Sequence, residues 1–153
     1  MNIRLAVEKD ITQLIKMRWD NTIEFDKSKK NESYEEFERE CRTFLESAIK
    51  SNQWFIWVAE DKGQIVSHIY IELIHKVPRL GRVTHPFAYM TNVYTIQEYR
   101  NRGVGSKVLR TINIWVKENK YEFVIVWPSD EAVHYYKKNG YVHCTEPMEY
   151  FPS

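Results

Sequence analysis

Between an apolar run and an amphipathic segment lies the sequence Glu98-Tyr99-Arg100-Asn101-Arg102-Gly103-Val104-Gly105-Ser106-Lys107. Beyond it, apolar residues recur at the spacing of one helix face, at Val104, Val108, Ile112, Trp115 and Val116. The two glycines therefore precede or open a helix, where unpaired backbone N–H groups and the positive end of the helix dipole meet. Glycine lets a ligand approach the backbone, and Arg100, Arg102 and Lys107 add positive charge. The segment is predicted to bind a phosphate-bearing ligand.

Two common phosphate-binding loops do not match this segment. A dinucleotide-binding fingerprint requires a third glycine, but position 108 is Val. A Walker loop requires four residues between its glycines and a Gly-Lys-Ser/Thr ending, which Gly105-Ser106-Lys107 does not provide. A plain tight turn before a surface helix is the simplest remaining alternative.

Length and composition favour one domain spanning residues 1–153, because 153 residues with 43% hydrophobic content can bury a sizeable core. The 22 Lys and Arg nearly balance the 21 Asp and Glu, so a global attraction to nucleic acid or to an anionic membrane is not expected. Cys41 and Cys144 lack metal-ligand spacing, and no apolar run is long enough to span a membrane. A cytoplasmic protein without a metal is expected.

The hydrophobic pattern predicts a strand at 3–7, a helix capped by Asp10, a polar loop at 22–33 and a second helix capped by Ser33. Strands follow at 54–59, 65–75 and 87–95. Residues 122–127 are continuously apolar, as in a strand buried on both faces. A short helix from Ser129 or Asp130 then ends at Asn139-Gly140, and a last strand begins at 141–144. This order predicts a mixed α/β or α+β sheet layered by helices.

Two segments carry a family resemblance. Arg100-Asn101-Arg102-Gly103-Val104-Gly105 has the form Arg or Gln, two residues, Gly, one residue, Gly or Ala. In Ala132-Val133-His134-Tyr135-Tyr136-Lys137-Lys138-Asn139-Gly140-Tyr141, a tyrosine lies four residues before a Gly-Tyr pair. In this order the chain resembles the GCN5-related N-acetyltransferases (GNATs). The resemblance implies a central, mostly antiparallel sheet flanked by about four helices. Its splayed parallel strands, at 87–95 and 123–127, would hold the pantetheine arm of acetyl-CoA.

The resemblance also implies which residues bind the cosubstrate. N–H groups from Arg102 to Lys107 would hold the pyrophosphate without a metal, and one N–H among Val93, Tyr94 and Thr95 would polarise the thioester carbonyl. Thr95 and Ser129 depart from the Val and Asn common in the family. The implied cosubstrate-binding residues are Val93, Tyr94, Thr95, Arg100, Asn101, Arg102, Gly103, Val104, Gly105, Ser106, Lys107 and Ser129.

The chemistry requires a general acid and a route for the amine proton, because an alkyl amine is almost fully protonated at neutral pH. The resemblance assigns the acid to Tyr136, with Tyr135 as a neighbour that should point elsewhere on the helix. No acidic residue lies in 87–95, so the base is open among Glu72, His68, His85 and water held by Tyr89 or Asn92. Glu72 and His68 would share one face of their strand.

The resemblance implies an acetyl-CoA-dependent N-acetyltransferase acting by direct attack of a primary amine in a ternary complex. The acceptor is expected to be a small molecule, with a protein N-terminus or lysine as the less favoured alternative, and the acidic Glu24, Asp26, Glu32, Glu35 and Glu36 would favour a cationic acceptor. A module that binds acyl-CoA without turnover is the alternative. The aromatic tail at 141–151 could offer an edge strand to a homodimer.

Overall fold

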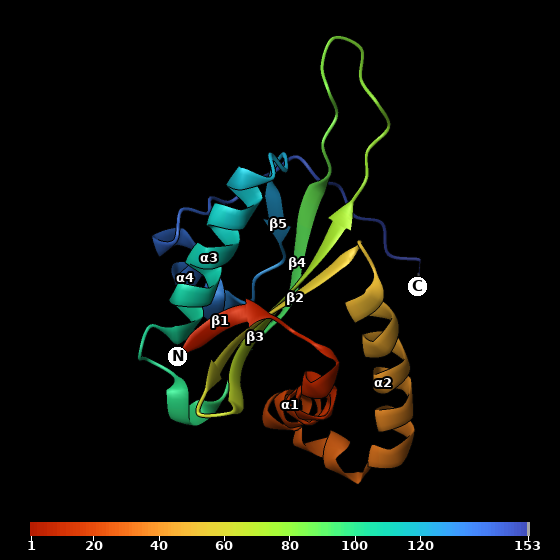
Figure 1. Ribbon diagram of the computed structural model, residues 1–153, viewed down its shortest axis with the longest axis vertical. Coiled ribbons are helices and arrows are strands. Elements are labelled where there is room, and N and C mark those ends of the chain that lie inside the picture. Colours follow the sequence, from red (N-terminus) through yellow and green to blue (C-terminus); the bar gives the residue numbers. More distant parts are fainter. Residues whose placement is uncertain (153) are drawn as a thin grey trace.

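The computed structural model describes residues 1–152, which form a five-stranded mixed sheet between two layers of helices (Figure 1). The strand order is β1-β2-β3-β4-β5. The first four strands are antiparallel to their neighbours, and β4 and β5 are parallel. The strands are β1 (Asn2–Leu5), β2 (Trp54–Asp61), β3 (Gln64–Ile74), β4 (Phe87–Thr95) and β5 (Val124–Val126). The predicted mixed, mostly antiparallel sheet is confirmed.

Four α-helices within residues 1–152 cover the sheet, with α1 and α2 on one face and α3 and α4 on the other (Figure 1). Each face has its own hydrophobic core: Leu14, Ile15 and Leu45 lie in one, and Leu109 and Ile112 lie in the other. No helix in this part of the chain is long and apolar enough to cross a membrane. The α-helices are α1 (Ile11–Phe25), α2 (Tyr34–Lys50), α3 (Val104–Glu118) and α4 (Val133–Lys138), and short 3-10 helices are η1 (Glu8–Asp10), η2 (Lys27–Asn31), η3 (Gln97–Tyr99) and η4 (Asp130–Ala132).

Of the four predicted helix caps, Ser33 and Gly140 agree with the structure, whereas Ser129 is the N-cap of η4 but makes no side-chain capping hydrogen bond. The Ser33 hydroxyl accepts a hydrogen bond from the backbone N–H of Glu36 (3.2 Å), and Gly140 follows α4 with a φ of +94°. Asp10 directly precedes α1, but its carboxylate accepts hydrogen bonds from Arg4 and from the Val7 N–H instead of capping that helix. Asp10 thus occupies the predicted N-cap position of α1, but its carboxylate is engaged by Arg4 and by the capping box of η1 and makes no bond to an N–H of α1.

The polar segment 22–33 is more regular than expected. Helix α1 continues to Phe25, and η2 follows almost directly. The Asp26 carboxylate caps η2 by accepting hydrogen bonds from both the N–H and the hydroxyl of Ser28, the second residue of this helix. Local capping therefore replaces the predicted open loop with a helical connection.

The last part of the chain differs most from expectation. Within residues 1–152, β5 is an edge strand, and Phe123 and Trp127 beside it are 45% and 59% exposed, so burial on both faces is wrong. Residues 141–144 form no strand. Tyr141 instead turns back on α4 through its N–H to the Tyr136 carbonyl (3.1 Å), and its hydroxyl donates to Asn113 (2.9 Å). A strand requires a hydrogen-bonding partner, and apolar composition alone does not supply one.

Candidate active site

The two parallel strands diverge at the middle of the molecule. β4 and β5 are paired at Ala88, Tyr89 and Met90, after which β4 continues to Thr95 while β5 ends at Val126. A cavity of about 220 Å³ opens where they separate. Residues 89–93 of β4 form one wall, and Ser129, Tyr135 and Tyr136 line it from the opposite side. The fold thus brings the predicted Val93 and Ser129 together with the tyrosines of the second motif, whereas no residue of the loop 100–107 lines this cavity.

A β-bulge lies in the β4 wall of this cavity. His68 is paired with Tyr94, but Tyr70 is paired with Thr91, so two residues of β4, Asn92 and Val93, lie opposite one residue of β3. Asn92 has a φ of +52°, in the left-handed region. The bulge releases backbone groups from the strand ladder beside the cavity. A register irregularity of this kind has no signal in the hydrophobic pattern.

The loop before α3 presents uncapped backbone amides. Gly103 has a φ of +76°, and no side chain caps the helix that follows it. The N–H of Lys107 donates to the Gly103 carbonyl (3.0 Å), so this amide already has an intrahelical acceptor. The amides that open the helix before Lys107 remain without intrahelical acceptors. They are the candidate anion-binding groups.

Gly105 has a packing role. A Cβ added there would lie 3.4 Å from the Tyr135 hydroxyl and 3.5 Å from the Thr95 side-chain oxygen. The Tyr135 hydroxyl donates a hydrogen bond to the Gly105 carbonyl (2.8 Å). Gly105 therefore lets the start of α3 pack tightly against β4 and α4, which is a different reason for glycine from the close approach of a ligand.

The three predicted cations of the loop are not equivalent. The Arg100 guanidinium donates to the Thr95 carbonyl (2.8 Å) and to both carboxylate oxygens of Glu24 (2.6 and 2.8 Å). This contact holds the pKa of Glu24 below its ordinary value. Arg102 instead lies 4.9 Å from the ring of Tyr99 and, like Lys107, is exposed. Arg100 therefore ties the loop to α1, and Arg102 and Lys107 are the cations open to solvent.

The same contact reduces the negative charge of the acidic residues that were expected to favour a cationic acceptor. Glu24 is neutralised by Arg100 and also accepts a hydrogen bond from the Tyr94 hydroxyl (3.2 Å). Asp26 is engaged with Ser28. Two of the five acidic residues that suggested a cationic acceptor are thus used in local structure.

Tyr135 and Tyr136 both line the cavity, so their positions on α4 do not separate them as expected. Their hydrogen bonds do. The Tyr135 hydroxyl is bound to Gly105, whereas the Tyr136 hydroxyl has no hydrogen-bond partner among residues 1–152. Burial raises the pKa of Tyr136 to about 12, so the phenol stays protonated at neutral pH.

The candidate bases are dispersed. Tyr89 and Asn92 line the cavity, whereas Glu72, His68 and His85 are not among its lining residues. Glu72 lies next to Tyr89 in the β3–β4 register and accepts a hydrogen bond from Gln53 (2.6 Å). His68 is completely buried, and burial lowers its pKa to about 4. Of the two side chains proposed to share one face of β3, neither enters the cavity.

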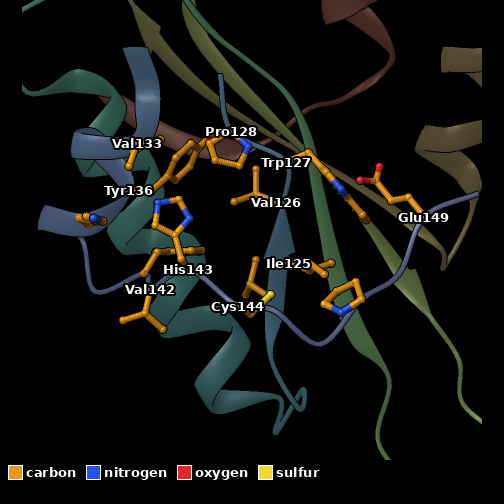
Figure 2. Close-up of a pocket in the computed structure, with 14 residues that line it drawn as sticks. Ile125, Val126, Trp127, Pro128, Val133, Tyr136, Val142, His143, Cys144 and Glu149 are labelled. Atoms are coloured by element: carbon orange, nitrogen blue, oxygen red, sulfur yellow. The ribbon is translucent and has the colours of Figure 1, made fainter. Parts of the chain in front are cut away.

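A second cavity, of about 250 Å³, lies on another side of Tyr136, between β5, α4 and the segment after Tyr141. Figure 2 shows Val142, His143 and Cys144 on the side of α4 and β5, and Glu149 beside Trp127. This hollow was not predicted, because residues 141–144 were expected to form a strand. Within residues 1–152, no group of three or more His, Cys, Asp or Glu side chains could hold a metal ion.

A splayed parallel strand pair next to a helix with a glycine-rich, uncapped start is the arrangement that the resemblance to the acetyltransferases implies. Residues 52–143 match the family model of the acetyltransferase (GNAT) domain, and the chain belongs to this family. A search of curated proteins finds no match.

Solved structures with the same fold include enzymes of several kinds. A predicted acetyltransferase from Clostridium acetobutylicum, solved with acetyl-CoA, is 25% identical, with a TM-score of 0.77 over 98% of this chain and 95% of that one. Glucosamine-6-phosphate N-acetyltransferase from Arabidopsis thaliana is 21% identical, with a TM-score of 0.72 over 99% and 98%. Aminoglycoside 6'-N-acetyltransferase from Acinetobacter haemolyticus is 17% identical, with a TM-score of 0.70 over 100% and 98%. The last two similarities concern the fold alone.

Proposed function

We propose that this protein transfers the acetyl group of acetyl-CoA to a primary amine of a small molecule, by direct attack within a ternary complex. The observation that carries the proposal is the cavity at the divergence of β4 and β5, which is lined by the bulged residues of β4 and by Tyr136, whose hydroxyl has no hydrogen-bond partner among residues 1–152. The Clostridium structure, which contains acetyl-CoA in the same fold, supports the choice of donor.

In this proposal the donor is held mainly by backbone. N–H groups of Gly103, Val104, Gly105 and Ser106 bind the pyrophosphate, and Arg102 and Lys107 add charge from solvent. The outer part of β4, residues 93–95, binds the pantetheine, and the Ser129 hydroxyl donates to it from the other wall. Arg100 and Asn101 shape the loop: Arg100 is occupied by Glu24, and Asn101 has a φ of +62°.

The proposed chemistry divides two proton transfers between the walls. The amine must lose a proton, which goes to water held by Tyr89 or Asn92 or, through water, to Glu72. An N–H of the bulge polarises the thioester carbonyl as negative charge develops on its oxygen. The thiolate of CoA leaves beside Tyr136, whose protonated phenol donates to the sulfur. No step requires a metal.

Thiol release from acetyl-CoA with a panel of amines tests the proposal, with Tyr136→Phe and Tyr135→Phe as a matched pair. We expect Tyr136→Phe to lower kcat about 100-fold, within the range typical of a lost general acid. Tyr135→Phe should keep kcat and weaken acetyl-CoA binding, because it loses the bond to Gly105. Full activity of Tyr136→Phe from pH 7 to pH 10 would remove this residue from the mechanism. Saturable binding of acetyl-CoA with no release by any amine would favour the non-catalytic module.

We also propose a homodimer in which the segment after Tyr141 of a second copy completes the edge of β5. The half-buried β5 and the strongly exposed tail residues Val142 (85%) and Tyr150 (87%) support it. Light scattering should give twice the monomer mass for the wild type and the monomer mass for Val142→Asp. A monomeric wild type at all concentrations tested would refute the dimer.

A further inference from the structure

Two unfavourable features coincide at the bulge of β4. Asn92 has a left-handed backbone conformation, which residues other than glycine seldom adopt, although Asn tolerates it better than most. His68, directly behind it on β3, is completely buried, and its Nε2 has no hydrogen-bond partner within residues 1–152. Each feature lowers stability, so their occurrence together in the wall of a cavity indicates a functional constraint.

The hydrogen bonds at the bulge have an unambiguous direction. His68 Nδ1 lies 2.9 Å from the carbonyl oxygen of Asn92, and a carbonyl can only accept. The ring therefore carries its hydrogen on Nδ1 and leaves Nε2 bare. From the side of α1, the Arg18 guanidinium donates to the Asn92 side-chain oxygen (3.3 Å). Asn92 is thus held through its main chain by β3 and through its side chain by α1.

The held carbonyl belongs to the peptide group that also contains the N–H of Val93. In a planar trans peptide, the C=O of one residue and the N–H of the next point in opposite directions. Fixing the Asn92 carbonyl toward His68 therefore fixes the Val93 N–H away from His68. Asn92 and Val93 both line the cavity where Tyr136 lies.

We propose that His68 is a positioning residue that holds the Asn92–Val93 peptide so that the Val93 N–H can serve as the oxyanion donor to the thioester. This inference rests on the proposed acetyl transfer and adds to it the side chain that orients the donor. His68 does not touch the substrate and is not the base. This role explains why position 68 is a histidine. An apolar side chain there would leave no buried nitrogen without a partner, but it could not hold the Asn92 carbonyl.

The test compares two substitutions at one position. His68→Asn retains a donor at nearly the place of Nδ1, and His68→Leu removes it at similar volume. Ser67→Ala is the control, because the Ser67 hydroxyl donates to the Tyr94 carbonyl (3.1 Å), outside the bulged peptide. For His68→Leu we expect kcat to fall about 10- to 100-fold with little change in KM, as for a misplaced oxyanion donor. His68→Asn should recover most of kcat, and Ser67→Ala should resemble the wild type.

Exchange of the Val93 amide hydrogen, measured by NMR, provides a readout besides turnover. Measured in the acetyl-CoA complex, where the thioester carbonyl would accept from this N–H, exchange should be faster in His68→Leu than in the wild type or His68→Asn. A folded His68→Leu protein with wild-type kcat and wild-type Val93 exchange would overturn the proposal. Should His68→Leu not fold, Asn92→Gly and Asn92→Ala decide the same question. Both lose the Arg18 contact, but only glycine keeps the left-handed backbone without strain, so kcat should fall further in Asn92→Ala, and equal kcat would contradict the proposal.

Failure of the acetyltransferase function would look different. In that case the wild type binds acetyl-CoA but releases no thiol with any amine. The role of His68 is then measured by the ratio of the affinities for acetyl-CoA and for CoA, since only the former offers a thioester carbonyl. This ratio should decrease toward one in His68→Leu, and an unchanged ratio would refute the positioning role.

Discussion

The two faces of the sheet build their parts of the site in different ways. On the face covered by α3 and α4, the candidate donor groups are backbone amides of consecutive residues, shaped by Gly103 and Gly105. On the face covered by α1 and α2, the groups near the cavity are side chains held by partners far away in the chain, such as Arg18 with Asn92. Donor recognition can therefore be encoded locally, whereas the acceptor side depends on how separate elements pack.

The largest effect is expected on the donor side. Gly105→Val would force a branched side chain against the Tyr135 hydroxyl, 3.4 Å from the position of the new Cβ. We expect acetyl-CoA affinity to fall about 100-fold, equivalent to about 3 kcal/mol, as measured by calorimetry. Gly63→Ala, in the β2–β3 turn at a φ of +82°, serves as the control for general loss of stability. Equal losses of affinity in the two variants would show that α3 packing is not specific to donor binding.

The second effect concerns stability on the acceptor side and its dependence on pH. The pKa of His68 is lowered by burial from 6.5 to about 4, so the unfolded chain binds more protons than the folded protein between these values. The free energy of unfolding should therefore decrease as the pH falls from 7 to 4, by about 3 kcal/mol from this residue alone.

Urea unfolding at several pH values, compared with His68→Asn, isolates the contribution. The Asn92 carbonyl that accepts the hydrogen bond from His68 does not titrate. If the difference in the free energy of unfolding between the two proteins stayed constant from pH 7 to pH 4, His68 would be hydrated in solution.

A smaller effect tests the link between the two faces. Glu24→Gln removes the charge partner of Arg100. The loop before α3 should then be held less firmly to α1, because the hydrogen bond from Arg100 to the Thr95 carbonyl does not reach that helix. We expect acetyl-CoA affinity to fall about threefold and the free energy of unfolding by no more than about 1 kcal/mol, because this ion pair is partly exposed. Tighter binding in Glu24→Gln would instead show that Arg100, once released, binds the phosphates directly.

The smallest effect is expected at the exposed cations. Arg102→Met should weaken acetyl-CoA binding about twofold to threefold at low salt, and the difference should disappear at about 1 M salt, where exposed charges are screened. Arg110→Met, on the exposed side of α3, is the matched control. A loss in Arg102→Met that persists at high salt would indicate a buried, directional phosphate contact.

Local patterns accounted for most of the fold. The five strands within residues 1–152, the stripe of α3, the Ser33 cap and the glycine after α4 were all predicted from contiguous residues. The prediction failed at 141–144, because apolar alternation cannot reveal whether a neighbouring strand is present. It also failed for the burial of β5, which depends on the same missing neighbour.

The candidate site was predictable to a similar extent. The residues of the loop before α3 and the tyrosines of α4 lie in short motifs; in the fold the tyrosines line one cavity, and Gly105 of the loop contacts Tyr135. The roles of individual side chains were not predictable in this way. The pairing of Glu24 with Arg100 joins residues far apart in sequence, and it ties the predicted phosphate-binding loop to α1.

From the sequence alone followed the family, the donor loop and the order of the elements, because each depends on interactions between residues close in the chain. Folding in three dimensions added the bulge at Asn92, the contact of His68 behind it and the distinction between Tyr135 and Tyr136. These features depend on strand register and on the packing of distant elements. A shift of the pairing register by one residue exchanges the two faces of a strand, and the local pattern does not fix it. In the proposed function, the loop before α3 binds the donor, and the geometry around Asn92 orients its thioester.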